Sequence, residues 1–202
     1  DQNTIILFTS DNGPVLDDGY YDNAIDSLGG HDPSGVFKGT KYQILEGGTR
    51  VPAIIWWPAK IKPGISTALM SQMDIIASWA SYLGIDIPEG SARDSENHMA
   101  AFMGQDPLGK QVLIENARTD LAIRVGDWKL VTQGNTQGQL FDLANDTTES
   151  QNACQHKQAR QTRYRVEGWR QNQRHSEHQA NAGANQGHGL GSDHVARLIC
   201  QQ

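Results

Sequence analysis

The segment from Thr4 to Thr9 places the tightest limit on what this chain can fold into. It is a short, continuous run of apolar and β-branched residues, and it ends at the polar sequence Ser10-Asp11-Asn12-Gly13-Pro14. This pattern predicts a buried strand that runs into a loop. A run that is apolar on both faces is typical of a sheet covered on both sides, so we expect an α/β fold with this segment as a central strand. Because the run starts almost at Asp1, we also expect the chain to be a fragment.

Three further patterns extend this prediction. Val51–Pro58 is a second apolar run with proline near each end, which indicates a second buried strand. Met70–Leu83 carries apolar residues at intervals of three and four and is followed by Gly84, which predicts an amphipathic helix. From Gln111 onward, short apolar runs separated by glycine and polar turns predict an antiparallel meander; these runs are Val112–Ile114, Leu121–Val125, Trp128–Val131 and Leu140–Leu143.

The composition changes along the chain and suggests three regions. Residues 1–108 are expected to belong to an α/β core, residues 109–150 to an antiparallel β subdomain, and residues 151–202 to a polar tail that is helical or weakly ordered. Within the first region, residues 15–40 are rich in Gly, Asp, Tyr and Pro and lack periodicity. Loops of this length in compact domains are usually functional or disordered.

Charge and hydropathy exclude two classes of partner. The formal net charge is −6, whereas nucleic-acid binding requires clustered excess Lys and Arg. The longest apolar stretch, Val51–Pro58, is far shorter than the roughly 20 residues that span a bilayer. No signal peptide opens the chain as given, since no charged segment followed by an apolar one is present. We therefore expect neither nucleic acid nor a membrane span.

Asp11 and Asn12 follow the first predicted strand, where ligands of open α/β sheets bind. A carboxylate and an amide carbonyl are hard oxygen donors that suit Ca²⁺ or Mg²⁺, and Gly13 lets the backbone turn away. Asp-Asn-Gly is also an ordinary turn sequence, and taken alone it favours the turn.

A second motif gives the pattern a specific meaning. Lys41 stands five residues before Glu46-Gly47-Gly48-Thr49-Arg50-Val51-Pro52. Together with the upstream Thr-Ser-Asp-Asn-Gly and with the later stretches Ala122–Val131 and Gln139–Leu143, this order resembles the C-terminal part of type I sulfatases, which are arylsulfatase-like members of the alkaline phosphatase superfamily. The resemblance covers residues 1 to about 150.

The resemblance implies part of an alkaline-phosphatase-like α/β sandwich with a C-terminal antiparallel β subdomain. It implies one Ca²⁺ ion bound by Asp11 and Asn12, and contact between Lys41 and the sulfate of an aryl or carbohydrate ester. An ammonium on a long stem is chemically suited to charge that develops on a sulfuryl oxygen. His31 lies between the two motifs and is either a substrate contact or a plain loop histidine. Glu46 and Arg50 are interpreted as a structural ion pair that fixes the loop.

The family's nucleophile is a formylglycine made from Cys or Ser in the pattern Cys/Ser-x-Pro-x-Arg. None of the seven prolines has Cys or Ser two residues before it, so this segment is absent from the 202 residues. The calcium site is therefore incompletely liganded, and the chain alone is expected to be inactive. A related phosphate or phosphonate ester hydrolase and a non-catalytic remnant stay open as alternatives. The resemblance also implies a periplasmic or extracellular location.

Overall fold

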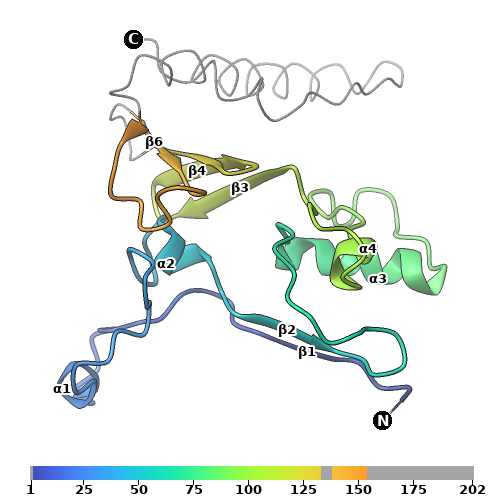
Figure 1. Cartoon of the computed structure of the whole chain (residues 1–202), viewed down its shortest axis with the longest axis horizontal. Coiled ribbons are helices and arrows are strands. Elements are labelled where there is room, and N and C mark those ends of the chain that lie inside the picture. The colour runs from blue at the N-terminus through green and yellow to red at the C-terminus, as the bar shows by residue number, and fades with distance from the viewer. Residues whose placement is uncertain (1, 133–137, 154–202) are drawn as a thin grey trace. The chain divides into compact units, whose positions relative to one another are not determined.

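The computed structural model describes residues 2–132 and 138–153, and these residues fall into two compact units. The first unit comprises residues 2–11 and 51–113, and the second comprises residues 12–50, 114–132 and 138–153. In chain order the elements are β1 (Ile6–Thr9), α1 (Ala24–Ser27), α2 (Glu46–Thr49), β2 (Ala53–Trp56), the 3-10 helix η1 (Gln72–Asp74), α3 (Ile75–Leu83), α4 (Met99–Phe102), β3 (Val112–Ala117), β4 (Asp120–Val125), β5 (Trp128–Thr132) and β6 (Gln139–Asp142) (Figure 1).

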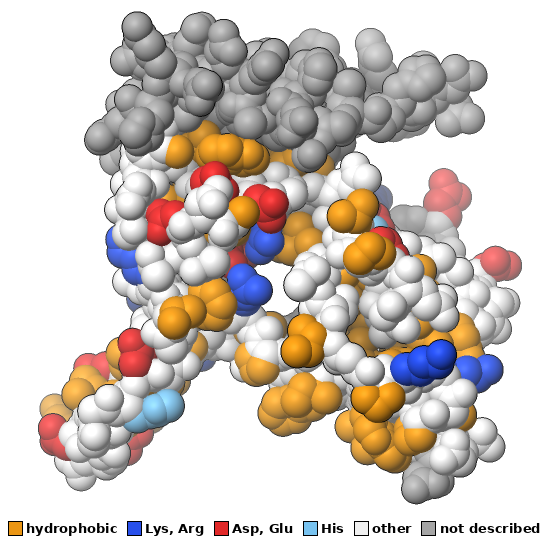
Figure 2. All heavy atoms as spheres, in the orientation of Figure 1, with side chains coloured by type: hydrophobic (Ala, Val, Ile, Leu, Met, Phe, Trp, Pro, Cys, Tyr) orange, Lys and Arg blue, Asp and Glu red, His pale blue; other side chains and the backbone are white. Residues whose placement is uncertain are grey.

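Strands β1 and β2 form an antiparallel pair in the first unit. The register places Ile6 opposite Trp56 and Phe8 opposite Ile54, so four large apolar side chains share one face of the pair. All four are exposed, and hydrophobic side chains gather over this part of the molecule in Figure 2. Within the described residues β1 pairs with β2 alone and the apolar face of the pair is exposed, so the prediction of a central strand covered on both faces is wrong there.

Helix α3 follows η1 directly and ends at Gly84, whose left-handed backbone (φ 65°) forms the C-cap. The predicted helix is therefore confirmed, although its first turn is a 3-10 turn. On this helix Ile76 and Leu83 are exposed, whereas Ser78 is buried. Ser78 accepts a hydrogen bond from the backbone N–H of His98 (2.9 Å), so the polar side of the helix holds the following loop.

The sheet β3-β4-β5-β6 confirms the predicted meander. Its strands are consecutive in sequence, and Gly126 and Asp127 alone connect β4 to β5; Gly126 has a positive φ of 57°, as tight hairpin turns require. One face of the sheet packs into a core made of Ile44, Ala122, Val131, Phe141 and Leu143. Ile44 belongs to the segment just before α2, so the core joins this segment to the meander. Figure 1 shows α2 beside the sheet.

The remaining described segments are irregular. Residues 15–40 form a series of turns in which α1 is the only helix, in agreement with the predicted loop. No helix in the described part of the chain is both long and apolar enough to cross a membrane. Of the predicted polar tail, residues 154–202 lie outside the described residues.

Candidate active site

The end of β1 is fixed by a side chain from η1. Gln72 donates hydrogen bonds through its amide to the hydroxyl of Thr9 (3.5 Å) and to the backbone carbonyl of Ser10. Asp11 follows as the last residue of this stretch of the first unit. The predicted position of Asp11 at the carboxyl end of the first strand is confirmed, since only Ser10 separates it from β1.

Asn12 and Gly13 open the second unit and pack against the Glu-Gly-Gly motif. The backbone N–H of Gly13 donates to the carbonyl of Gly48 (2.9 Å), and the side-chain amide of Asn12 donates to the carbonyl of Gly13 (2.8 Å). A Cβ atom at Gly13 would lie 1.8 Å from the carbonyl oxygen of Gly47. The two sequence motifs therefore meet backbone to backbone, which only glycine permits.

Lys41 is tied to the same pair of segments. Its backbone N–H donates to the carbonyl of Pro14 (2.8 Å), and the N–H of Gly47 donates to the carbonyl of Lys38 (2.8 Å). The Lys41 side chain is half-buried, and its Nζ lies 5.3 Å from the centre of the Tyr42 ring. The structure thus brings the Lys41 segment next to the Asn12–Pro14 segment, and the Glu-Gly-Gly motif is hydrogen-bonded to both.

Glu46 begins α2 and is buried with three cations. Its Oε1 contacts Lys129 Nζ at 2.9 Å, while its Oε2 lies 3.4 Å from Arg50 and 3.5 Å from Arg124. Burial alone would raise the pKa of Glu46, but these cations, Lys129 foremost, lower it overall. The expected ion pair between Glu46 and Arg50 is confirmed.

Sequence reasoning missed Lys129, the cation that lowers the pKa of Glu46 most. Lys129 is fully buried, and its Nζ also approaches Glu149 (3.3 Å) and Glu115 (3.5 Å). Glu149 Oε2 in turn accepts the backbone N–H of Glu46 (2.6 Å). Burial would lower the pKa of Lys129, but the surrounding carboxylates raise it. The available signal was a lone lysine at a core-facing position of the otherwise apolar run Trp128–Val131.

His31 lies in the turn after α1. Its backbone N–H donates to the carbonyl of Leu28 (2.9 Å), and its side chain is exposed. Its role in substrate binding stays a prediction.

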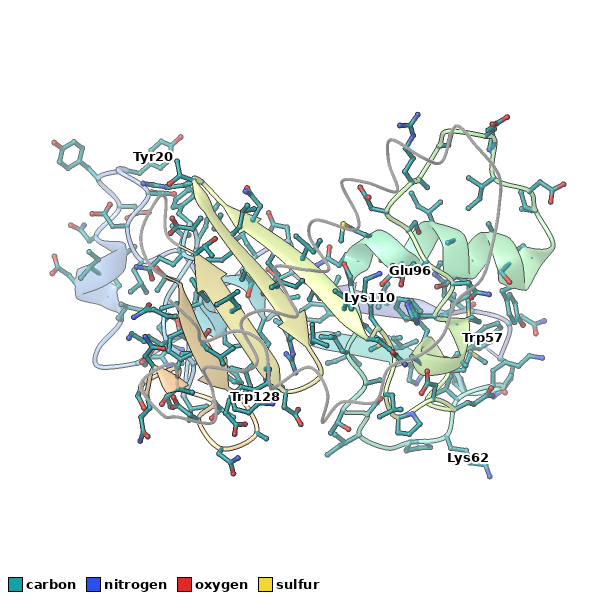
Figure 3. The ribbon with its side chains drawn as sticks, turned by 90° about the horizontal axis from the view of Figure 1, so that it is seen from above. Tyr20, Trp57, Lys62, Glu96, Lys110 and Trp128 are labelled. Carbon is teal, nitrogen blue, oxygen red and sulfur yellow. The ribbon has the colours of Figure 1, made fainter. Side chains whose placement is uncertain are left out.

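A separate polar cluster lies in the first unit, where Asp74, Glu96 and His98 form a group that could hold a metal ion. Lys110 already supplies a cation there, with Nζ 3.0 Å from Asp74 and 2.9 Å from Glu96; Figure 3 shows Glu96 and Lys110 side by side. Burial opposes the charged form of Lys110, but hydrogen bonds to the two carboxylates raise its pKa. An ammonium already balances this group, so we interpret it as an ion-pair cluster that holds the loop after α3.

Solved structures define the class of the fold. A 6S-sulfatase of Bacteroides thetaiotaomicron, described with the metabolism of multiple glycosaminoglycans, superposes with a TM-score of 0.72 and 40% identity over 76% of this chain and 35% of its own. The structure of i-CgsB with a neocarrahexaose gives a TM-score of 0.63 and 27% identity over 83% of this chain and 36% of its own. The fold is that of the alkaline-phosphatase-like sulfatases, as the sequence predicted.

The family follows from the sequence comparisons. Residues 1–85 match the family model Sulfatase. The chain is 42% identical over 168 residues to an N-acetylgalactosamine-6-O-sulfatase of Bacteroides thetaiotaomicron. This match covers 75% of this chain and 33% of that protein. It is 33% identical to an arylsulfatase of Hemicentrotus pulcherrimus, over 63% of this chain and 22% of that protein. This chain belongs to the sulfatase family, and it spans about a third or less of the length of these relatives.

Proposed function

We propose that this chain is the C-terminal part of a calcium-dependent sulfatase that hydrolyses sulfate esters of carbohydrates. The observation that carries the proposal is the interlock of three segments: Gly13 bonds to Gly48, Lys41 bonds to Pro14, and Gly47 bonds to Lys38. These bonds hold Lys41 and Asn12 on one framework. The carbohydrate class is supported by the N-acetylgalactosamine-6-O-sulfatase among the relatives.

The donor chemistry of Asp11 and Asn12 fits Ca²⁺. A carboxylate and an amide oxygen are the ligand types that this ion prefers. The Nδ2 atom of Asn12 donates to the Gly13 carbonyl, and Oδ1 is the atom of this amide that would coordinate the ion. Bound calcium would supply positive charge to the sulfuryl oxygens. Six to eight oxygens are usual for Ca²⁺, so water or further residues would have to complete the site.

Lys41 would bind the sulfate group through its ammonium. The half-buried position leaves the charge less screened than on an open surface, which strengthens its attraction to an anion. His31 would contact the substrate from the exposed loop. We further propose a periplasmic or extracellular location, where sulfated polymers are met.

The test uses the complete enzyme that contains this chain together with the nucleophile segment. Lys41→Ala should lower kcat/KM for N-acetylgalactosamine 6-sulfate by about 10²–10³, because one charged stabiliser of the transition state is lost. The control is Lys62→Ala, which changes a lysine that is exposed. Equal activity of the two variants would overturn the role of Lys41.

Two further measurements address the alternatives. Calcium chelation should abolish hydrolysis and its return should restore it. An aryl phosphate should be cleaved far more slowly than an aryl sulfate; the reverse order would favour a phosphate or phosphonate ester hydrolase.

A further inference from the structure

The buried ions around Lys129 form a compact group that the proposed chemistry does not use. We call it the Lys129 cluster; it consists of Glu46, Glu115, Arg124, Lys129 and Glu149. Lys129 is fully buried and contacts all three carboxylates within 3.5 Å. Arg124 is the register partner of Lys129 on the neighbouring strand and reaches the other oxygen of Glu46.

The cluster is connected to the candidate site through α2. Glu46 is the first residue of α2, and the two residues that follow it carry the contacts to the site segments. Gly47 donates to the carbonyl of Lys38, and Gly48 accepts from Gly13. A rotation or shift of α2 would therefore move the backbone next to Asn12 and the segment that leads to Lys41.

We propose that Lys129 is a positioning residue, which sets the orientation of α2 and thereby places Asn12 and Lys41 for the reaction. This inference rests on the proposed function for what the placed residues do. The inference assigns a role to the antiparallel meander, because β4 and β5 supply the two cations, Arg124 and Lys129, that hold Glu46 at the start of α2.

The geometry distinguishes positioning from simple packing. The two carboxylate oxygens of Glu46 are held by different cations, Oε1 by Lys129 and Oε2 by Arg124, and the backbone N–H of Glu46 is held by Glu149. Three directional contacts fix the rotation of the residue that starts α2. Apolar packing of the same volume would supply stability without this direction, since buried ion pairs are often replaceable by apolar groups as far as stability is concerned.

The test compares Lys129→Met with Leu130→Ala in the complete enzyme. Leu130 is buried and neighbours Lys129 in β5 but points to the other face of the sheet, so its truncation destabilises the meander without touching the cluster. Glu46→Gln, which keeps the shape of the side chain, serves as a second variant where Lys129→Met does not fold.

Two readouts are expected. Hydrogen exchange at the amides of Gly13 and Lys41 should be at least tenfold faster in Lys129→Met than in Leu130→Ala. The two variants are compared under conditions that give them the same free energy of unfolding. For N-acetylgalactosamine 6-sulfate, kcat should fall 10- to 100-fold in Lys129→Met, while Leu130→Ala stays within about threefold of the wild type.

The outcomes separate this inference from the proposed function. Equal exchange and equal kcat in Lys129→Met and Leu130→Ala would overturn the positioning role. Faster exchange in Lys129→Met, together with unchanged hydrolysis in Lys41→Ala, would support the link from Lys129 to the loop while overturning the sulfatase role of Lys41.

Discussion

Three carboxylates share the buried ammonium of Lys129, yet they are not equivalent. Glu46 is also near Arg50 and Arg124, and the cations outweigh burial so that its pKa is lowered. For Glu149, burial is the largest influence and the charge of Glu46 adds to it, so its pKa is raised despite Lys129. Folding therefore makes Glu46 easier to ionise and Glu149 harder to ionise than the same groups in the unfolded chain.

This difference predicts that two substitutions change the free energy of unfolding by different amounts. Glu149→Gln removes a charge that the fold disfavours and keeps an oxygen for the N–H of Glu46, so it should change the free energy of unfolding by less than about 1 kcal/mol. Glu46→Gln deprives Lys129 of its nearest partner and should cost about 3 kcal/mol. Urea unfolding at pH 7 measures both. A larger loss for Glu149→Gln than for Glu46→Gln would contradict the opposite directions of the two pKa shifts.

Removing the ammonium should also change how stability depends on pH. In the wild type, the lowered pKa of Glu46 contributes stability above its ordinary value of 4.5, and this contribution is lost as the pH falls through the folded-state pKa. In Lys129→Met the same buried carboxylates lack their cation and destabilise the fold while they are charged. Protonation at low pH removes this destabilisation. The destabilisation caused by Lys129→Met should therefore be larger at pH 8 than at pH 5, as urea unfolding at the two values would show. A pH-independent difference would speak against buried charge as its cause.

At the scale of elements, the loop after β1 can approach α2 closely only because Gly13 has no side chain. Gly13→Ala should destabilise the protein by more than about 2 kcal/mol, because the new Cβ would lie 1.8 Å from a backbone oxygen and the backbone has to move. The control is Gly64→Ala, since no atom lies within 4 Å of a Cβ built there. Thermal unfolding of the two variants provides the comparison. Similar midpoints would show that the loop after β1 is not closely packed against α2.

The sequence predicted the elements better than their faces. The runs at Leu121–Val125 and Trp128–Val131 became β4 and β5 because alternation and a glycine turn are local signals. Helix α3 formed where expected, but its buried side carries Ser78, which, like Asp74 just before the helix, accepts a backbone hydrogen bond from a loop about 20 residues away. The motifs also predicted that Asn12 and Lys41 belong to one site. In contrast, the contacts of Glu46 with Arg124, Lys129 and Glu149 reach 78 to 103 residues further along the chain, a separation that periodicity cannot reveal.

At the scale of the whole molecule, the described residues form only part of what a sulfatase fold contains. The chain covers 33% of an N-acetylgalactosamine-6-O-sulfatase, and the β1–β2 pair exposes Ile6, Phe8, Ile54 and Trp56 on one face. Soluble proteins rarely leave a contiguous apolar face of this kind uncovered. We interpret it as the face against which further parts of the sulfatase domain pack in the complete enzyme.

The isolated 202-residue chain should therefore show no sulfatase turnover and should bind Ca²⁺ only weakly. An activated nucleophile supplies the reaction path, and Lys41 has no reaction to stabilise without one. Asp11 and Asn12 together bring a single negative charge, which falls well short of the several anionic ligands of dedicated calcium sites. Hydrolysis of a chromogenic aryl sulfate, with and without calcium, and calorimetric titration of the metal measure the two properties. Multiple turnover above a buffer control that Lys41→Ala abolishes would show that these residues contain a nucleophile of another type.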